Sequence, residues 1–360
     1  MKNIVIYINL LNGLLVSLLI FAVVLNLAPG GMWNFMLMSA SATDTDKLMG
    51  IVADIVPQYN DYISNSLTVD GNNNSSNKDK NNAQNDNNND SVSVSVDEAV
   101  MGNIIKKTLT PYNANLKVGN VCINNQSGAT VDVSSELSKA LDFYITKGKE
   151  PQILIYHTHT TEGYMMSEDE YYTTADEPRT TDDEKNVVAV GERIVEQLEA
   201  AGYAVIHDTT IHDYPGFSGS YSRSAETVKE VLKEYPSIKI AIDLHRDSIS
   251  SGENDKVAPV VSVNGKEAAQ VMLVMGSQTG SVTDYPNWRH NLRFAMKLQY
   301  LFETQYPQFA RSLLLRSTKY NQNLTKGSIL IEMGSDANTL EQALYSGELV
   351  GKTLVTLFNS

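Results

Sequence analysis

A short apolar run that ends in two histidines and a carboxylate is the strongest constraint in this chain. Residues 152–156 are too few for a helix and are typical of a buried strand, and His157, His159 and Glu162 follow directly. Open α/β sheets place their sites at the carboxyl ends of strands. On a continuing strand His157 and His159 would point the same way, because they are two residues apart. His159 and Glu162 have the spacing of two ligands of one metal ion if the chain turns here.

Two further apolar runs end in chemically active side chains. Residues 238–244 precede His245, and residues 328–333 contain Glu332, with a glycine next but one. A single histidine at a strand end is most often an ordinary hydrogen-bonded polar group. Three such ends carrying His, His and Glu in one domain instead favour a mononuclear zinc hydrolase.

Strand and helix patterns alternate from residue 151 onwards. This alternation predicts an α/β fold with a mostly parallel sheet flanked by helices. The chain lacks the G-x-S-x-G motif of serine hydrolases, which disfavours serine catalysis. The predicted strands are 152–156, 203–207, 238–244, 270–275, 312–315 and 328–333, and the predicted helices are 186–201, 222–235, 291–306 and 339–357.

The amino-terminal segment carries no charge from Ile4 to Leu27. A helix of that length spans about 36 Å, enough for a bilayer core of roughly 30 Å. Because only Lys2 and the terminus are positive before it, the amino terminus is expected in the cytoplasm and the rest outside. A signal peptide cleaved after Ala42 is the competing interpretation. The apolar run is longer than a signal core of about 7–15 residues, which favours an uncleaved anchor.

The pattern of the chain suggests five parts. Residues 1–30 form a cytoplasmic tip and transmembrane anchor, and residues 31–67 a juxtamembrane segment with helical spacing. Residues 68–95 are rich in asparagine and are expected to be a disordered linker. Residues 96–150 are a small extension, and residues 151–360 are the zinc hydrolase domain. In and beside the extension we predict a strand at 91–96, a hairpin within 116–124 and a helix at 137–146.

Charge and cysteine content exclude several classes of protein. Forty-two acidic residues against 28 basic ones give a net charge of −14, which argues against a nucleic-acid binder. The single cysteine, Cys122, excludes an intrachain disulfide. It also argues against a structural zinc site, which usually contains several cysteines.

The region from about residue 100 to 360 resembles the stage II sporulation protein P family. The two histidine motifs carry most of the likeness, and the anchor and spacer match the family's layout. Gly163-Tyr164 departs from the commoner Glu-Ser-Tyr. The matching residues are 157–164, 179–182, 186–188, 190–191, 211–215, 219–224, 242–247, 286–289, 320–322 and 331–334.

This resemblance implies a membrane-anchored peptidoglycan hydrolase that acts during engulfment of the forespore. The expected activity is that of a zinc-dependent N-acetylmuramoyl-L-alanine amidase, with cleavage of stem-peptide cross-links as well. The fold would be similar to cell-wall zinc amidases and, more distantly, to zinc carboxypeptidases. The expected location is the cell membrane, with the catalytic domain between the forespore and mother-cell membranes. The implied partners are stage II sporulation proteins D and M.

The two similar folds imply different zinc ligands. The carboxypeptidase pattern gives His159, Glu162 and His245, whereas the amidase pattern gives Asp182 as the third ligand. Glu162 is the preferred third ligand. His157 is either a further ligand or a supporting group.

Other roles follow from the same resemblance. Glu332 would be the general base. Arg246 or Arg223 would stabilise the oxyanion or hold a stem-peptide carboxylate, unless it forms a plain salt bridge with Asp243 or Asp247. Those two aspartates are also candidates to orient His245. The predicted substrate-binding residues are Arg223, Tyr221, His212 and Asn287.

Two alternative functions stay open from the sequence. One is a zinc carboxypeptidase or endopeptidase that acts only on stem peptides. The other is a non-catalytic wall-binding scaffold, against which an intact Glu332 argues.

Overall fold

The computed structural model of the chain describes residues 99–176 and 178–360. The predicted anchor, juxtamembrane segment, asparagine-rich linker and strand at 91–96 lie outside these residues. Within the described part, no helix combines the length and the apolar character that a membrane span needs.

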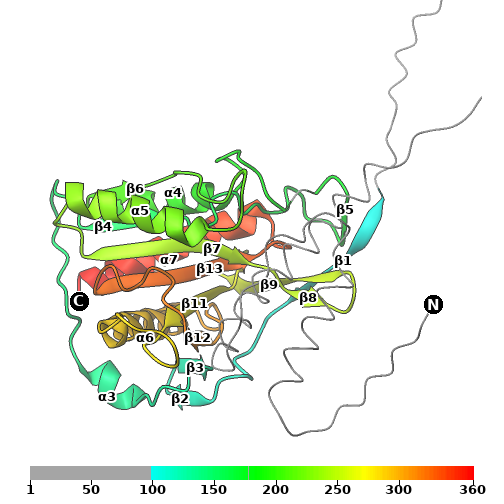
Figure 1. Cartoon of the computed structure of the whole chain (residues 1–360). Coiled ribbons are helices and arrows are strands. Elements are labelled where there is room, and N and C mark those ends of the chain that lie inside the picture. Colours follow the sequence, from blue (N-terminus) through cyan, green and yellow to red (C-terminus); the bar gives the residue numbers. More distant parts are fainter. Residues whose placement is uncertain (1–98, 177) are drawn as a thin grey trace, which may run out of the picture. The chain divides into compact units, whose positions relative to one another are not determined.

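An eight-stranded sheet in the order β2-β3-β12-β11-β13-β7-β4-β6 forms the centre of the fold (Figure 1). Five of its strand pairs are parallel. The remaining two pairs, β11 with β13 and β2 with β3, are antiparallel. The predicted mostly parallel α/β sheet is therefore confirmed. The strands are β2 (Leu116–Val118), β3 (Val121–Asn125), β4 (Ile153–Tyr156), β6 (Val205–His207), β7 (Ile240–Asp247), β11 (Val271–Gly276), β12 (Leu313–Arg316) and β13 (Gly327–Ser335).

Helices cover both faces of this sheet. Successive strand residues alternate between the faces, so Ile153 and Ile155 pack into the larger core with α4, α6 and α7. Leu154 and Tyr156 pack into a second core with α5. The helices are α4 (Val187–Ala200), α5 (Ser220–Glu234), α6 (Trp288–Gln305) and α7 (Leu340–Phe358), so each predicted helix from residue 186 onwards is confirmed to within a few residues.

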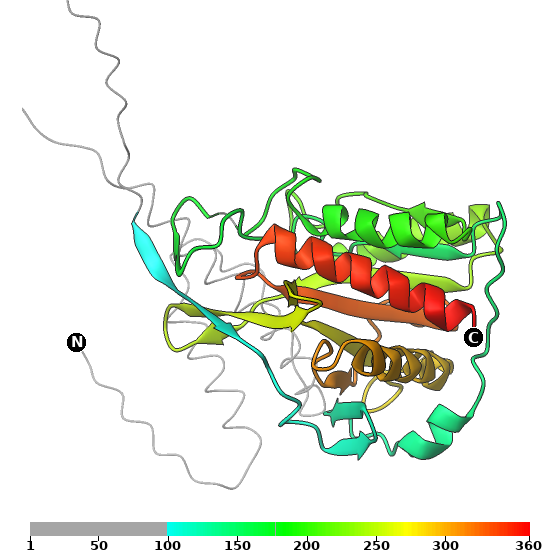
Figure 2. The ribbon, with the colours of Figure 1, turned by 180° about the vertical axis from the view of Figure 1, so that it is seen from behind.

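Helices α4 and α7 lie side by side, as Figure 2 shows from behind. Glycines on α7 allow this close approach. A Cβ atom on Gly347 would lie 2.7 Å from the carbonyl oxygen of Val190, and one on Gly351 would lie 2.7 Å from the Cβ of Gln197. Such distances are too short for a side chain, so the two helices can pack this closely only with glycine at these positions.

A second, smaller sheet projects beside the main one (Figure 1). Its order is β10-β9-β1-β5, with β8 paired to β9. The sequence analysis predicted none of these strands, and β1 is largely exposed, so it has no clean apolar alternation. The strands are β1 (Val100–Lys107), β5 (Tyr171–Thr173), β8 (Ser250–Ser251), β9 (Asp255–Val263) and β10 (Lys266–Ala269).

The helix predicted at 137–146 is wrong. The helix in this region is α3 (Val133–Ser138), which begins where the Asp132 carboxylate accepts a hydrogen bond from the backbone of Ser135. The chain is extended from Lys139. Leu141 and Phe143 pack against the larger core from this extended segment, because residues two apart share a face of an extended chain.

Candidate active site at the carboxyl ends of the central strands

His245 and Glu332 lie next to each other on parallel strands. They are register partners in the pairing of β7 with β13. His245 follows Ala241 and Asp243 on the face of β7 that α5 covers, since residues two apart share a face. The strand ends predicted to carry the site therefore do bring their polar side chains together.

His245 is held between two carboxylates. Its Nε2 atom lies 2.9 Å from Oδ1 of Asp243, and its Nδ1 atom lies 3.5 Å from Oε2 of Glu162. Burial alone would lower the pKa of His245, but these two carboxylates raise it well above its usual value of 6.5. Asp243 is buried and also accepts hydrogen bonds from the backbone and hydroxyl of Thr158. Asp243 is therefore fixed in place to orient the imidazole.

His159 completes the cluster from the turn after β4. Its ring lies 5.2 Å from that of His245, at an angle of 88°. Its Nδ1 atom is buried and has no hydrogen-bond partner among the described residues. Burial lowers the pKa of His159 to about 4, so the ring is neutral near pH 7. A neutral imidazole with a free buried nitrogen is suited to bind a metal ion.

Glu162 lies beside both histidines. Its Oε2 atom accepts a hydrogen bond of 3.0 Å from the backbone of Arg246. Burial alone would raise the pKa of Glu162, but His245, Arg246 and His159 hold it well below its usual value. The side chain is therefore a carboxylate at neutral pH.

Glu332 has the opposite electrostatic environment. Its Oε2 atom is buried without a hydrogen-bond partner in the described residues. Burial and the nearby Asp247 carboxylate raise the pKa of Glu332 to about 8. Two glutamates in one buried cluster thus differ in protonation, which is the arrangement expected of a charged ligand and a proton-transfer group.

The donor set fits a zinc ion by its chemistry. Within residues 99–176 and 178–360, no three His, Cys, Asp or Glu side chains already converge as a metal cage. However, an unpartnered buried nitrogen such as Nδ1 of His159 costs free energy unless something binds it. Two histidines and a carboxylate are the usual ligands of catalytic zinc, so His159, Glu162 and His245 suit this ion once His245 has released its extra proton.

His157 lies on the other face of the sheet from His245. Its Nδ1 atom is 3.1 Å from the carbonyl oxygen of Leu244, and its Nε2 atom is 3.0 Å from Nε2 of His207. His157 and His159 do not share a direction, because β4 ends at Tyr156 and the chain turns before His159 instead of continuing as a strand. Of the two roles considered for His157, the structure supports that of a supporting group.

The structure does not bring Asp182 to the histidines. Its carboxylate pairs with Lys185 at 2.8 Å, and 40% of its side chain is exposed. Glu162, which contacts His245 directly, is the better-placed third ligand.

The guanidinium groups of Arg246 and Arg223 bind backbone carbonyls. The Arg246 side chain donates to the carbonyls of Gly163 and Pro178, because residue 246 points to the opposite face of β7 from His245. Arg223 donates to carbonyls of the loop before α5, including that of Ser218 at 3.0 Å. Neither arginine pairs with Asp243 or Asp247 in the described contacts, and Asp247 binds Arg311 instead.

Arg179 is the arginine at the cluster, and the sequence analysis gave it no role. Its Nη1 atom lies 2.6 Å from Oδ2 of Asp213, and its Nη2 atom lies 3.7 Å from Oε1 of Glu162. Its guanidinium also covers the ring of Phe217, which stacks on His159 with 4.4 Å between ring centroids. The only sequence signal for Arg179 was its place in a motif of the resembled family.

The predicted substrate-binding residues have different environments. The Tyr221 ring lies nearly parallel to that of His245, 6.3 Å away, and thus borders the cluster. His212 is buried, and its two nitrogens contact the carbonyl of His157 and the hydroxyl of Thr227. Asn287 donates to the carbonyl of Thr325 and supports a loop. Tyr221 is the predicted substrate-binding residue that lies at the cluster.

Comparison with solved structures finds distant likeness to cell-wall amidases. N-acetylmuramoyl-L-alanine amidase AmiC2 of Nostoc punctiforme is 10% identical, with a TM-score of 0.34, over 59% of this chain and 100% of that chain. The CwlD amidase from Clostridioides difficile, in complex with the GerS lipoprotein, is 12% identical, with a TM-score of 0.33, over 57% of this chain and 94% of that chain. These TM-scores are too low to establish a shared fold.

Comparison of sequences identifies the family. Stage II sporulation protein P of Bacillus subtilis (strain 168) is 29% identical over 208 residues, which cover 55% of this chain and 48% of that protein. The match thus spans about half the length of the curated relative. The family described as "Stage II sporulation protein P (SpoIIP)" matches residues 36–354. The chain therefore belongs to the stage II sporulation protein P family.

Proposed function

We propose that this chain is a zinc-dependent peptidoglycan hydrolase of sporulation that cleaves the amide bond between N-acetylmuramic acid and L-alanine. The observation that carries the proposal is one cluster of the buried Glu162 and His245 with the partly buried His159 and Glu332, at the carboxyl ends of β4, β7 and β13. This cluster combines metal ligands with an acid free to move a proton. Family membership supplies the sporulation context.

In this proposal, His159, Glu162 and His245 hold the zinc ion. When bound, zinc supplies Lewis acidity and a water nucleophile that is active near neutral pH. Asp243 fixes the His245 ring through its contact of 2.9 Å with Nε2. Phe217 stacks on His159 and holds its ring at the cluster.

Glu332 moves the proton. In its ionised form, the unpartnered Oε2 atom takes a proton from the water that attacks the lactyl carbonyl carbon. The same atom returns this proton to the leaving nitrogen as the C–N bond breaks. The products are the lactyl carboxylic acid and the free amine of L-alanine. Arg179 places a positive charge beside Glu162, where it balances negative charge that develops on the carbonyl oxygen.

The cellular setting is proposed from the resemblance. The chain would be held at the cell membrane by residues 4–27, which lie outside the described residues. Its catalytic domain would act on peptidoglycan on the extracytoplasmic side, between the forespore and mother-cell membranes. Stage II sporulation proteins D and M are the proposed partners.

Digestion of purified peptidoglycan tests the proposed reaction. The full-length chain in detergent is incubated with zinc or with chelator, and the products are read by mass spectrometry. Release of intact stem peptides from glycan strands is expected with zinc and not with chelator. His245→Ala should abolish release, whereas His290→Gln, which changes a histidine that contacts Asp142 instead, should retain it.

Other products would identify a different function. Peptides cut only within the stem would replace the amidase by a peptidase. A folded, zinc-loaded chain that releases nothing would support the scaffold function.

A further inference from the structure

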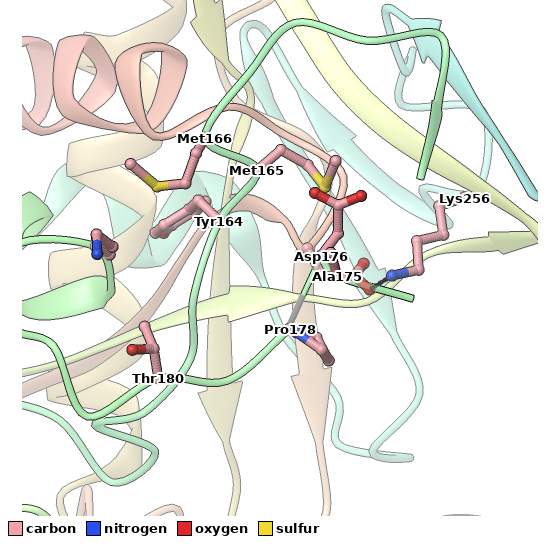
Figure 3. A pocket seen from close by; sticks show the side chains of 10 residues that line it. Tyr164, Met165, Met166, Ala175, Asp176, Pro178, Thr180 and Lys256 are labelled. Carbon is pink, nitrogen blue, oxygen red and sulfur yellow. Dashed lines mark ion pairs between the residues drawn. The ribbon is translucent and has the colours of Figure 1, made fainter. Parts of the chain in front are cut away.

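Figure 3 shows a pocket of about 240 Å³, whose lining includes residues close in sequence to Glu162 and Arg179. Two short segments connect it with the cluster. Glu162 and Arg179 form an antiparallel bridge, and the backbone of Gly163 donates to the carbonyl of Pro178 at 3.0 Å. The residues that follow Glu162 and those that flank Arg179 line the pocket. Its lining includes Tyr164, Met165, Met166, Pro178, Lys256 and Asp336.

The pocket contains a buried carboxylate with a free oxygen. Asp336 is only 6% exposed. Its Oδ2 atom pairs with Nζ of Lys256 at 3.0 Å, an ion pair drawn in Figure 3. Its Oδ1 atom is buried and has no hydrogen-bond partner among the described residues. A buried acceptor left unsatisfied costs free energy, so a ligand N–H group would bind there favourably.

The other residues that line the pocket are both charged and apolar. Lys185 and Asp176 add one further charge of each sign. Tyr164, Met165 and Met166 supply apolar walls that suit methylene groups. Pockets for drug-sized ligands measure about 300–1,000 Å³, so this pocket suits a group about as large as one amino-acid residue.

We propose that this pocket binds a diamino-acid residue of the stem peptide through a zwitterionic end, an ammonium and a carboxylate on the same carbon. The ammonium donates to Oδ1 of Asp336, and the carboxylate pairs with Lys256. This inference rests on the proposed function, because a stem peptide cut at the cluster would pass along the connecting segments. The pocket would thus select which stem peptides are cut.

Calorimetric titration with two peptides tests this assignment. The first probe is L-alanyl-γ-D-glutamyl-meso-diaminopimelate, and the second carries L-lysine in place of the diamino acid and so lacks the carboxylate. The full-length chain is expected to bind the first about tenfold more tightly, the effect of one charged interaction of about 1.4 kcal/mol. Equal binding of the two probes would overturn the proposal.

Three variants and one control locate the interaction. Lys256→Met should remove the preference between the peptides, whereas Asp336→Asn should weaken the binding of both, since both carry the ammonium. Ala175→Trp should weaken both peptides by filling the pocket without removing either charge of the ion pair, which covers the case in which Asp336→Asn does not fold. Lys233→Met, a matched change in the last turn of α5, should leave the preference intact. A preference that survives in the folded Lys256→Met chain, or unchanged binding of both peptides to the folded Asp336→Asn chain, would refute the assignment.

The catalytically impaired His245→Ala chain separates this inference from the proposed reaction. It is expected to keep the preference between the peptides while releasing no product. If the unmodified chain shows the preference but never cuts the muramoyl amide, the proposed reaction fails and the pocket assignment stands. If it cuts the amide and binds both peptides equally, the proposed reaction stands and the pocket assignment fails.

Discussion

Glu332 on β13 and His245 on β7 are register partners on adjacent parallel strands, and both side chains lie in the same buried cluster. Their surroundings differ. Two carboxylates flank His245, whereas Oε2 of Glu332 has no hydrogen-bond partner among the described residues. A buried acid without a partner is costly for stability, which points to a chemical role for Glu332.

Glu332→Gln should separate catalysis from stability. The amide cannot accept and return the proton, so hydrolysis of peptidoglycan should fall on the order of 10²–10⁴-fold. Glutamine has the same shape and no charge, so the melting temperature should stay unchanged or rise. Turnover and thermal unfolding of the full-length chain check the two effects. A variant that keeps full activity would remove Glu332 from the mechanism.

Zinc binding should depend on the histidines of the cluster and not on others. The purified chain is expected to bind one zinc ion, and His159→Ala or His245→Ala should lose it. His157→Gln should keep the ion, because His157 contacts Leu244 and His207 on the other face of the sheet. Metal content after dialysis gives the readout. Loss of zinc from His157→Gln with normal folding would make His157 a ligand.

Arg179→Met should slow hydrolysis more than Arg223→Met does. Arg179 lies beside Glu162, whereas Arg223 holds a surface loop. A charged hydrogen bond is worth about 1.5–3 kcal/mol, so a loss of roughly 10–100-fold in kcat/KM is expected for Arg179→Met. Steady-state kinetics on a soluble muramoyl peptide measure both variants. Equal losses for the two variants would show that the charge of Arg179 beside Glu162 makes no special contribution to hydrolysis.

Gly191→Ala should disturb the support behind the site. A Cβ atom at Gly191 would lie 2.7 Å from Nε2 of His207 and 3.1 Å from Cε1 of His157. Overpacking of this kind costs about 1–3 kcal/mol. Gly216→Ala is the matched control, since a Cβ atom there meets nothing within 4 Å. Urea denaturation of both variants should show the loss for Gly191→Ala alone.

The ion pair of Glu136 on α3 with Arg293 on α6 should make the stability of the chain depend on pH. Burial alone would raise the pKa of Glu136, but hydrogen bonds from Lys139 and Arg293 outweigh it and hold the pKa below 4.5. A lowered carboxyl pKa adds stability that is present above the unfolded value and is lost as the pH falls through the folded value. The stability of the chain should therefore decline below about pH 4.5.

Glu136→Gln measures that contribution. At neutral pH it should destabilise the chain by about 1.5–3 kcal/mol, since Arg293 loses a charged partner at 2.8 Å. The difference from the unmodified chain should shrink below about pH 4.5, where the carboxylate becomes protonated. Glu230→Gln, on the exposed side of α5, should change stability by less than about 0.5 kcal/mol at either pH. A difference for Glu136→Gln that does not vary with pH would contradict the electrostatic explanation.

Helix and strand positions in the main sheet were predictable because their signals are local. Apolar residues at helical spacing placed α4, and an apolar run bounded by polar residues placed β4. The extended segment after α3 was mistaken for a helix because Leu137 and Leu141 also fit helical spacing. The pairing of β1 with β9 escaped prediction because it joins residues about 150 positions apart.

The sequence alone determined that histidines and a glutamate lie at or near the carboxyl ends of buried strands, and these ends meet at one edge of the sheet. Only the tertiary structure decided which of these groups act together. The turn after β4 sends His159 toward His245 and leaves His157 against α4. Packing between distant segments, which no local pattern records, also put Arg179 rather than Arg246 beside Glu162.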